Sequence, residues 1–265
     1  MEAVLGMRAL KDMFGFPFRD EGKGKKFLTG SLVFISGFFI PILPWIALLG
    51  YAARIARNSI EGQPAHLPEW ENWSDLLADG LKLFVTSLLL SLPSSLLFII
   101  GFGTYIGGFT GALIAQASAG DQASTPFFML MMFSMAFMFF AMTFGTLLAC
   151  VSWFLLAPVG AHVVANQRLS AAFEIRQWWR LLAANWGGFA LVFFVMFALW
   201  AIEYLLFYLV YTTIVLCMFI PIILAPFTIY MVAITSMMAG QSYREAREKL
   251  DAPVGDTPVV EVAGV

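Results

Sequence analysis

Charged side chains are scarce in this sequence. They make up 12% of its 265 residues, about half of the roughly 25% that a water-soluble domain carries. So little charge cannot cover a surface in contact with water, and the mean hydropathy of +0.83 excludes a soluble globular domain. The formal net charge of -2 gives no basic surface for nucleic acid. The sequence therefore predicts an integral membrane protein.

Cysteine and histidine are also rare. Cys150 and Cys217 both lie in apolar runs, which excludes a disulfide scaffold and favours a role as small hydrophobic residues. Two histidines cannot form a His-Glu-x-x-His motif here or a multi-histidine metal site within one chain. The lysines of the segment 22–26 lack the spacing of a phosphate-binding loop. We therefore expect a protein that is not an enzyme and has no cofactor and no metal.

Long apolar runs are abundant and divide the chain into five segments. A transmembrane helix needs about 20 residues, so the second and third runs, at about 40 residues each, must tilt, protrude, bend or double back. The pattern predicts an all-α polytopic membrane helix bundle with about four full spans and a broken first segment. The runs are Phe27–Ala53, Leu81–Ala119, Pro126–Ala165, Trp186 to about Tyr211, and about Thr213 to Met238.

Lysines and arginines predict the orientation. They gather before residue 27, in the segments 54–82 and 167–180, and after residue 243, whereas the turns near Asp121 and Tyr211 have none. By the positive-inside rule both termini are cytoplasmic, in the cell membrane. We expect three parts: a basic cytoplasmic amphipathic segment (1–26), a membrane domain (27–243), and a short helical turn with a mobile cytoplasmic tail (244–265).

The first apolar run contains Pro41 and Pro44, and each proline removes a backbone donor and breaks a helix. Basic residues flank both ends of this run, yet about 27 residues cannot cross a bilayer of about 30 Å twice. A re-entrant hairpin with its hinge at these prolines resolves the conflict. The alternative is a single kinked span followed by an external loop.

An internal echo suggests a repeated unit. Residues 45–58 align with residues 153–166, and each copy is followed by a tryptophan segment, at Trp73 and at Trp178. The predicted unit is a membrane helix, an amphipathic interfacial helix anchored by tryptophan, and a helix that re-enters the membrane. The identities are few, so a chance match remains open.

These segments resemble a known family. Pro41 to Tyr51 with the following Arg54, then Leu67-Pro-Glu-Trp70 and Asp79-Gly-Leu-Lys82, look like the bacterial and archaeal multi-pass membrane family catalogued as domain of unknown function 4013. Residues 170–181 and 221–243 are similar to its later parts, so the resemblance covers about residues 30–246. It implies an all-helical membrane domain and no established chemistry, and therefore no catalytic residues.

Glycines in the second run give the clearest packing motif. Gly103, Gly107 and Gly111 recur every four residues, which places them on one helix face and lets another backbone approach closely. A nearby match to the dinucleotide-binding fingerprint misses by one position and lies in an apolar run. We expect these glycines to pack helices.

A few polar residues remain as candidates for a site. His66 and Glu69 lie in an acidic segment that forms either a cation site with Asp75 or, as we favour, a solvated loop in which Glu69 pairs with an arginine. His162 is expected to bond a carbonyl group at a helix end rather than to relay protons. Glu203 is embedded in the fourth run, where an acid is a functional candidate by default, although its depth places it near the outer interface.

Two functions follow from these patterns. The first is a non-enzymatic scaffold or accessory subunit of a membrane complex, which packs with itself or with protein subunits in the lipid bilayer. The second is a small transporter or lipid-handling protein that uses the broken first helix and the repeat as a gate. The near absence of charge within the apolar runs favours the first.

Overall fold

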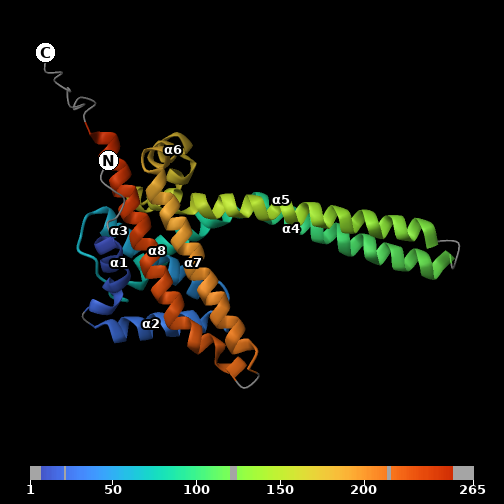
Figure 1. Cartoon of the computed structure of the whole chain (residues 1–265), viewed down its shortest axis with the longest axis horizontal. Helices are drawn as coiled ribbons and strands as arrows, with labels where there is room; N and C mark the ends of the chain where they lie inside the picture. The colour runs from blue at the N-terminus through green and yellow to red at the C-terminus, as the bar shows by residue number, and fades with distance from the viewer. Residues whose placement is uncertain (1–6, 21, 120–123, 214–215, 253–265) are drawn as a thin grey trace, which may run out of the picture. The chain divides into compact units, whose positions relative to one another are not determined.

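The computed structural model describes residues 7–20, 22–119, 124–213 and 216–252, and no strand occurs among them. The all-helical fold predicted from the sequence is confirmed (Figure 1). The helices are α1 (Met7–Arg19), α2 (Lys23–Ser36), α3 (Leu43–Ile60), α4 (Trp73–Ala119), α5 (Ser124–Asn166), η2 (Leu169–Phe173), α6 (Ile175–Ala184), α7 (Trp186–Tyr211), η3 (Leu216–Phe219) and α8 (Ile220–Asp251).

Four of these helices are long and apolar enough to cross a membrane: α4, α5, α7 and α8. The chain is therefore a multi-pass membrane protein. The two longest apolar runs do not double back, because α4 has 47 residues and α5 has 43, and each is one continuous helix of about 65–70 Å.

The chain divides into two compact units. Unit 1 comprises Met1–Leu83 and Ala157–Val265, and unit 2 comprises Phe84–Leu156. The helix expected in the basic N-terminal segment is present as α1. Of the tail expected after residue 243, the first part continues α8 to Asp251, whereas residues 253–265 lie outside the described residues.

The first apolar run is broken where its prolines predict a break. Helix α2 ends at Ser36 and α3 begins at Leu43, with Pro41 between them. Ile42 has a φ of 71°, outside the helical range, and Pro44 falls in the first turn of α3, where its missing N–H costs nothing. Helices α2 and α3 pack against each other, and neither is among the candidate spans. The side of the membrane that residues 61–72 occupy stays a prediction.

Helix α8 packs against α1, α2, α3, α6 and α7 in unit 1, and glycines let α3 and its neighbours approach closely. A Cβ atom added at Gly50 would lie 1.9 Å from the Leu76 carbonyl oxygen, and one added at Gly80 would lie 1.9 Å from the Ile46 carbonyl oxygen. The first turns of α4 therefore cross α3 backbone to backbone. On α8, a Cβ at Gly240 would lie 2.4 Å from the carbonyl oxygen of α3 Ala56.

In unit 2, the glycines that bring α4 and α5 together are different from the predicted ones. A Cβ at Gly101 would lie 2.4 Å from the Ala141 Cβ, and one at Gly108 would overlap the Ser134 hydroxyl. The predicted motif makes no such close approach within the described chain, so its role in packing helices stays a prediction. A Cβ at Gly103 or Gly107 would meet nothing within 4 Å, and one at Gly111 would make only an ordinary contact with Leu130.

The repeat is reproduced only in part. Trp178 lies in a separate short helix, α6, as the repeat predicts, but Trp73 begins α4, which continues without interruption into the second apolar run. The prediction of a separate interfacial helix at Trp73 is therefore wrong. The difference lies in the sequence that follows each tryptophan: Asn185 ends α6 with a φ of -135°, whereas no residue of α4 breaks the helix after Trp73.

Candidate functional site

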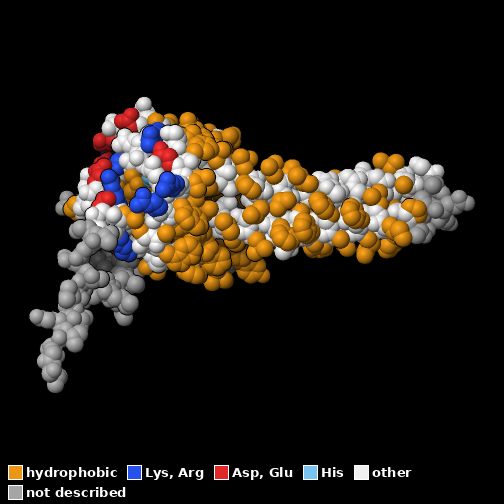
Figure 2. Space-filling view, turned by 90° about the horizontal axis from the view of Figure 1, so that it is seen from above, with side chains coloured by type: hydrophobic (Ala, Val, Ile, Leu, Met, Phe, Trp, Pro, Cys, Tyr) orange, Lys and Arg blue, Asp and Glu red, His pale blue; other side chains and the backbone are white. Residues whose placement is uncertain are grey.

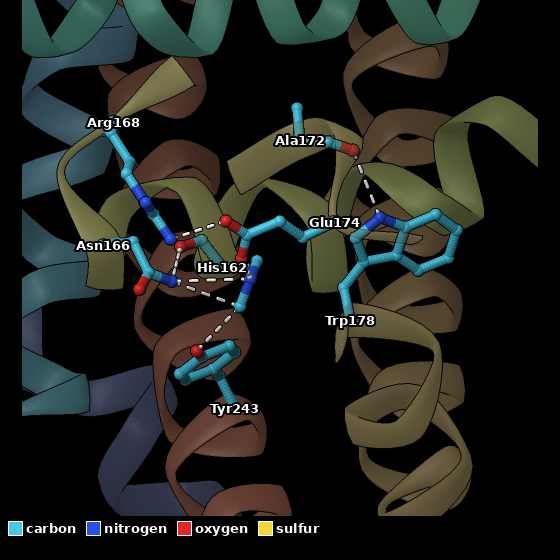
Figure 3. Close-up of polar contacts among 7 residues, drawn as sticks. All are labelled: His162, Asn166, Arg168, Ala172, Glu174, Trp178 and Tyr243. Carbon is cyan, nitrogen blue, oxygen red and sulfur yellow. Dashed lines mark hydrogen bonds and ion pairs between the residues drawn. The ribbon is translucent and has the colours of Figure 1, made fainter. Parts of the chain in front are cut away.

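The most concentrated polar cluster lies around His162, near the end of α5. The imidazole is buried, with 3% of its surface exposed. The chain leaves α5 at Asn166 and turns at Gln167, which has a φ of 55°. It then forms η2 and reaches Glu174 immediately before α6. This turn brings the Glu174 carboxylate back to the histidine (Figure 3).

Both ring nitrogens of His162 have side-chain partners. Nε2 lies 3.2 Å from a carboxylate oxygen of Glu174, and Nδ1 lies 3.0 Å from the Tyr243 hydroxyl of α8. The second carboxylate oxygen accepts a hydrogen bond of 2.5 Å from Arg168, and Asn166 donates to the His162 carbonyl over 2.8 Å. The prediction that the imidazole bonds a carbonyl group is therefore wrong, because the ring contacts a carboxylate and a phenol.

A neutral imidazole satisfies this geometry when its Nε2–H donates to Glu174 and its Nδ1 accepts from the Tyr243 hydroxyl. Carboxylate, imidazole and phenol thus form a continuous chain along which a proton can move. The ring is almost completely enclosed, so a substrate does not reach it in this arrangement. What the cluster accomplishes directly is to join α5, α6 and α8.

A second cluster surrounds Lys26 at the start of α2. Its ammonium group is 2.7 Å from the Asp20 carboxylate and 2.7 Å from the Leu67 carbonyl oxygen, and it lies 3.2 Å from the Glu69 carboxylate. Burial alone would lower the pKa of this amine, but the hydrogen bonds and charges of Asp20 and Glu69 outweigh it and raise the pKa above 10.5. Glu69 therefore pairs with a lysine, and the expected arginine partner is wrong.

Two aromatic rings complete the Lys26 cluster. The Trp70 indole donates a hydrogen bond of 3.0 Å to the Lys26 carbonyl oxygen. It also stacks on Tyr51 of α3, with ring centroids 4.1 Å apart and planes 4° from parallel. Trp70 and Glu69, the last two residues of the Leu-Pro-Glu-Trp segment, thus attach the loop after α3 to α2.

The remaining predicted polar residues do not converge. His66 is exposed, and its ring contacts the Pro64 carbonyl oxygen at 2.8 Å and the Asn58 amide at 3.3 Å. In the part of the chain that the structure describes, no group of three or more His, Cys, Asp or Glu side chains could hold a metal ion. Glu203 is half-buried in α7 and accepts a short hydrogen bond from Thr228 of α8.

Sequence reasoning missed the buried Asn185, between α6 and α7. Its amide donates to the Ser242 carbonyl oxygen over 3.0 Å, and its side-chain oxygen accepts a hydrogen bond of 2.7 Å from Lys249. The signal was a single polar residue between the apolar end of α6 and the apolar helix α7. An isolated amide at a helix start is usually a local cap, so its bonds to α8 could not be inferred from the sequence.

Comparison with known proteins gives one match. The family model described as "Protein of unknown function (DUF4013)" matches residues 33–212, which include Glu69 and Trp70 of the Lys26 cluster together with His162 and Glu174. Lys26, Tyr243 and the resemblance noted beyond residue 212 lie outside the match. No curated protein and no solved structure matches the chain. The family match covers more than half of the sequence, and the chain belongs to this membrane-protein family of unknown function.

Proposed function

We propose that this protein is a non-enzymatic scaffold or accessory subunit of a membrane complex, and that its assembly face is on α4. The observation that carries the proposal is the open pair Gly103 and Gly107. Both are exposed, and a Cβ at either position would meet nothing within 4 Å.

The position of these glycines on α4 supports this role. At 3.6 residues per turn, Gly103 and Gly107 lie on the other side of the helix from Gly101 and Gly108, which approach α5. Glycine costs helix stability relative to alanine, about 1 kcal/mol per residue. Small residues in membrane helices let a second backbone approach closely. A partner helix from a second copy or from another subunit is the occupant that this face fits.

The test compares glycine-to-leucine changes on α4 with one on α7. Gly103→Leu with Gly107→Leu is expected to dissociate the complex that the full-length protein forms in mild detergent, measured by mass. Gly187→Leu on α7 is the matched control, because a Cβ there also meets nothing within 4 Å. A complex that survives the α4 change, or a wild-type protein that is monomeric in bilayer nanodiscs, contradicts the proposal.

One observation favours the second candidate function, a small transporter. Glu203 and Thr228 form a hydrogen-bonded pair between α7 and α8, and polar groups inside membrane spans mark solute and ion paths. On this hypothesis, Glu203→Gln leaves folding intact and abolishes solute movement in liposomes. If the variant instead fails to assemble, Glu203 has a structural role.

A further inference from the structure

We propose that α6 is a binding surface for anionic phospholipid, with Arg176 and Arg180 contacting the lipid phosphate. This site is separate from the assembly face on α4, and either can fail without the other. It rests on the distribution of side chains around α6 and on the ion pairs of its surroundings.

Helix α6 presents three different faces. Trp178, Leu181 and Leu182 are buried, each with at most 7% of its surface exposed, and α6 packs on α7 and α8. The Trp178 indole donates a hydrogen bond of 3.2 Å to the Ala172 carbonyl oxygen (Figure 3). This bond holds the tryptophan on the inner face. Its neighbour Trp179 therefore lies outside.

The outer surface is divided into an apolar and a basic edge. Ile175 and Trp179 are 62% and 55% exposed and are one turn apart, so they lie together beside the buried face. Arg176 and Arg180 are exposed and also one turn apart, on the side farther from the core. An amphipathic helix at a membrane interface has this distribution, with aromatic side chains toward the acyl chains and arginines toward the phosphates.

Arg176 and Arg180 have no anionic partner in the part of the chain that the structure describes. Within the described residues, no ion pair or hydrogen bond engages the guanidinium group of Arg176 or Arg180. The nearest acid in sequence, Glu174, is already paired with Arg168 and His162. In Figure 2, lysine and arginine side chains lie among acidic ones beside the hydrophobic surface.

An anionic phospholipid fits this surface better than a zwitterionic one. A guanidinium group binds phosphate oxygens through its fork of N–H donors, and two unpaired guanidiniums one turn apart leave excess positive charge that a zwitterionic headgroup does not neutralise. The arginines lie in a segment that the positive-inside rule assigns to the cytoplasmic side. Anionic lipids give the cytoplasmic leaflet a negative surface potential, which attracts basic side chains.

The experiment measures lipid retained by the detergent-purified full-length protein, using native mass spectrometry and titration with phosphatidylglycerol or phosphatidylcholine of identical acyl chains. The wild type is expected to prefer phosphatidylglycerol. Arg176→Gln with Arg180→Gln is expected to weaken that binding about 25-fold, from about a fivefold effect per basic residue. Binding of phosphatidylcholine stays unchanged, and the corresponding double lysine variant retains most of the preference.

Two further variants locate the site. Arg247→Gln removes an exposed arginine of α8 that pairs with Asp251 at 3.9 Å, and it is expected to leave lipid binding unchanged. Trp179→Phe is expected to reduce the quenching of protein fluorescence by phosphatidylglycerol with brominated chains. Equal affinity of wild type and the glutamine variant for phosphatidylglycerol would overturn the proposal. The proposal would also be overturned if replacing the arginines released a stoichiometric acidic protein from the purified sample instead of lipid.

Discussion

The crossing of α3 with the first turns of α4 gives the sharpest prediction for stability. An alanine at Gly80 would place its Cβ 1.9 Å from the Ile46 carbonyl oxygen and 2.8 Å from the Gly50 amide nitrogen. Both are backbone atoms, so no side-chain rotation relieves the overlap and the helices must move apart by more than 1 Å. Overpacking costs about 1–3 kcal/mol, and a backbone clash belongs near the upper limit. Alanine's higher helix propensity offsets about 1 kcal/mol, leaving a net loss of about 2 kcal/mol.

The assay is thermal unfolding in mild detergent, followed by tryptophan fluorescence. A loss of about 2 kcal/mol corresponds to a midpoint roughly 4–8 °C lower, by the scale of domains of this size. Gly187→Ala on α7 is the control, because it lies outside the proposed assembly face: its Cβ meets nothing within 4 Å, so the midpoint is expected to stay level or rise slightly. If Gly80→Ala and Gly187→Ala unfold at the same temperature, the close backbone contact between α3 and α4 is refuted.

Three other changes test the polar clusters and the first helix pair. His162→Ala is expected to lower the free energy of unfolding by about 2–4 kcal/mol, because it leaves a cavity and unpaired polar groups. His66 is exposed, so His66→Ala is expected to change the unfolding midpoint little. Equal effects of the two variants would contradict the buried position of His162. Lys26→Met leaves the Asp20 carboxylate buried without its partner and is expected to cost about 3–5 kcal/mol, which Asp20→Asn partly restores. Because folding raises the pKa of Lys26, its contribution is complete below pH 10.5 and is lost as the pH rises through the raised value; a loss of stability near pH 8 that disappears in Lys26→Met would refute this. A single cysteine at Gln63, in a background without the native cysteines, is expected to react with an impermeant reagent only from the cytoplasmic side, and labelling from outside would exclude the hairpin.

The glycines show what spacing can and cannot predict. A repeat every four residues correctly identifies side chains that share a helix face, but it does not identify the face that a neighbouring helix occupies. In α4 the neighbour α5 lies on the side of Gly101 and Gly108, whose separation of seven residues gives a weaker signal than the run from Gly103 to Gly111. Helix content, the broken first run and the long apolar helices were accessible from the sequence, because local periodicity and proline chemistry determine them.

The polar clusters were less accessible because their members are distant in sequence. His162 and Tyr243 are separated by 81 residues and Lys26 and Leu67 by 41, so each contact depends on how α8 and the loop after α3 pack. Composition identified Glu69 as an acid in need of a cation, but not which cation. Choosing between Lys26 and a nearby arginine required the fold, in which Arg54 is already engaged by backbone carbonyl oxygens.

The two units use different means to hold their helices, and this difference bears on the proposed assembly. In unit 1, charged and aromatic side chains connect elements that are far apart in sequence. In unit 2, hydroxyls such as those of Thr104 and Thr110 donate to carbonyl oxygens of their own helix. The pairing of α4 with α5 combines the fit of small residues with a hydrogen bond of 2.6 Å from the Ser152 hydroxyl of α5 to the Leu90 carbonyl oxygen of α4. Fit of this kind is the usual basis of helix association in lipid. A second helix that approached the open glycines of α4 would bind by the same fit of small residues, without any new polar group.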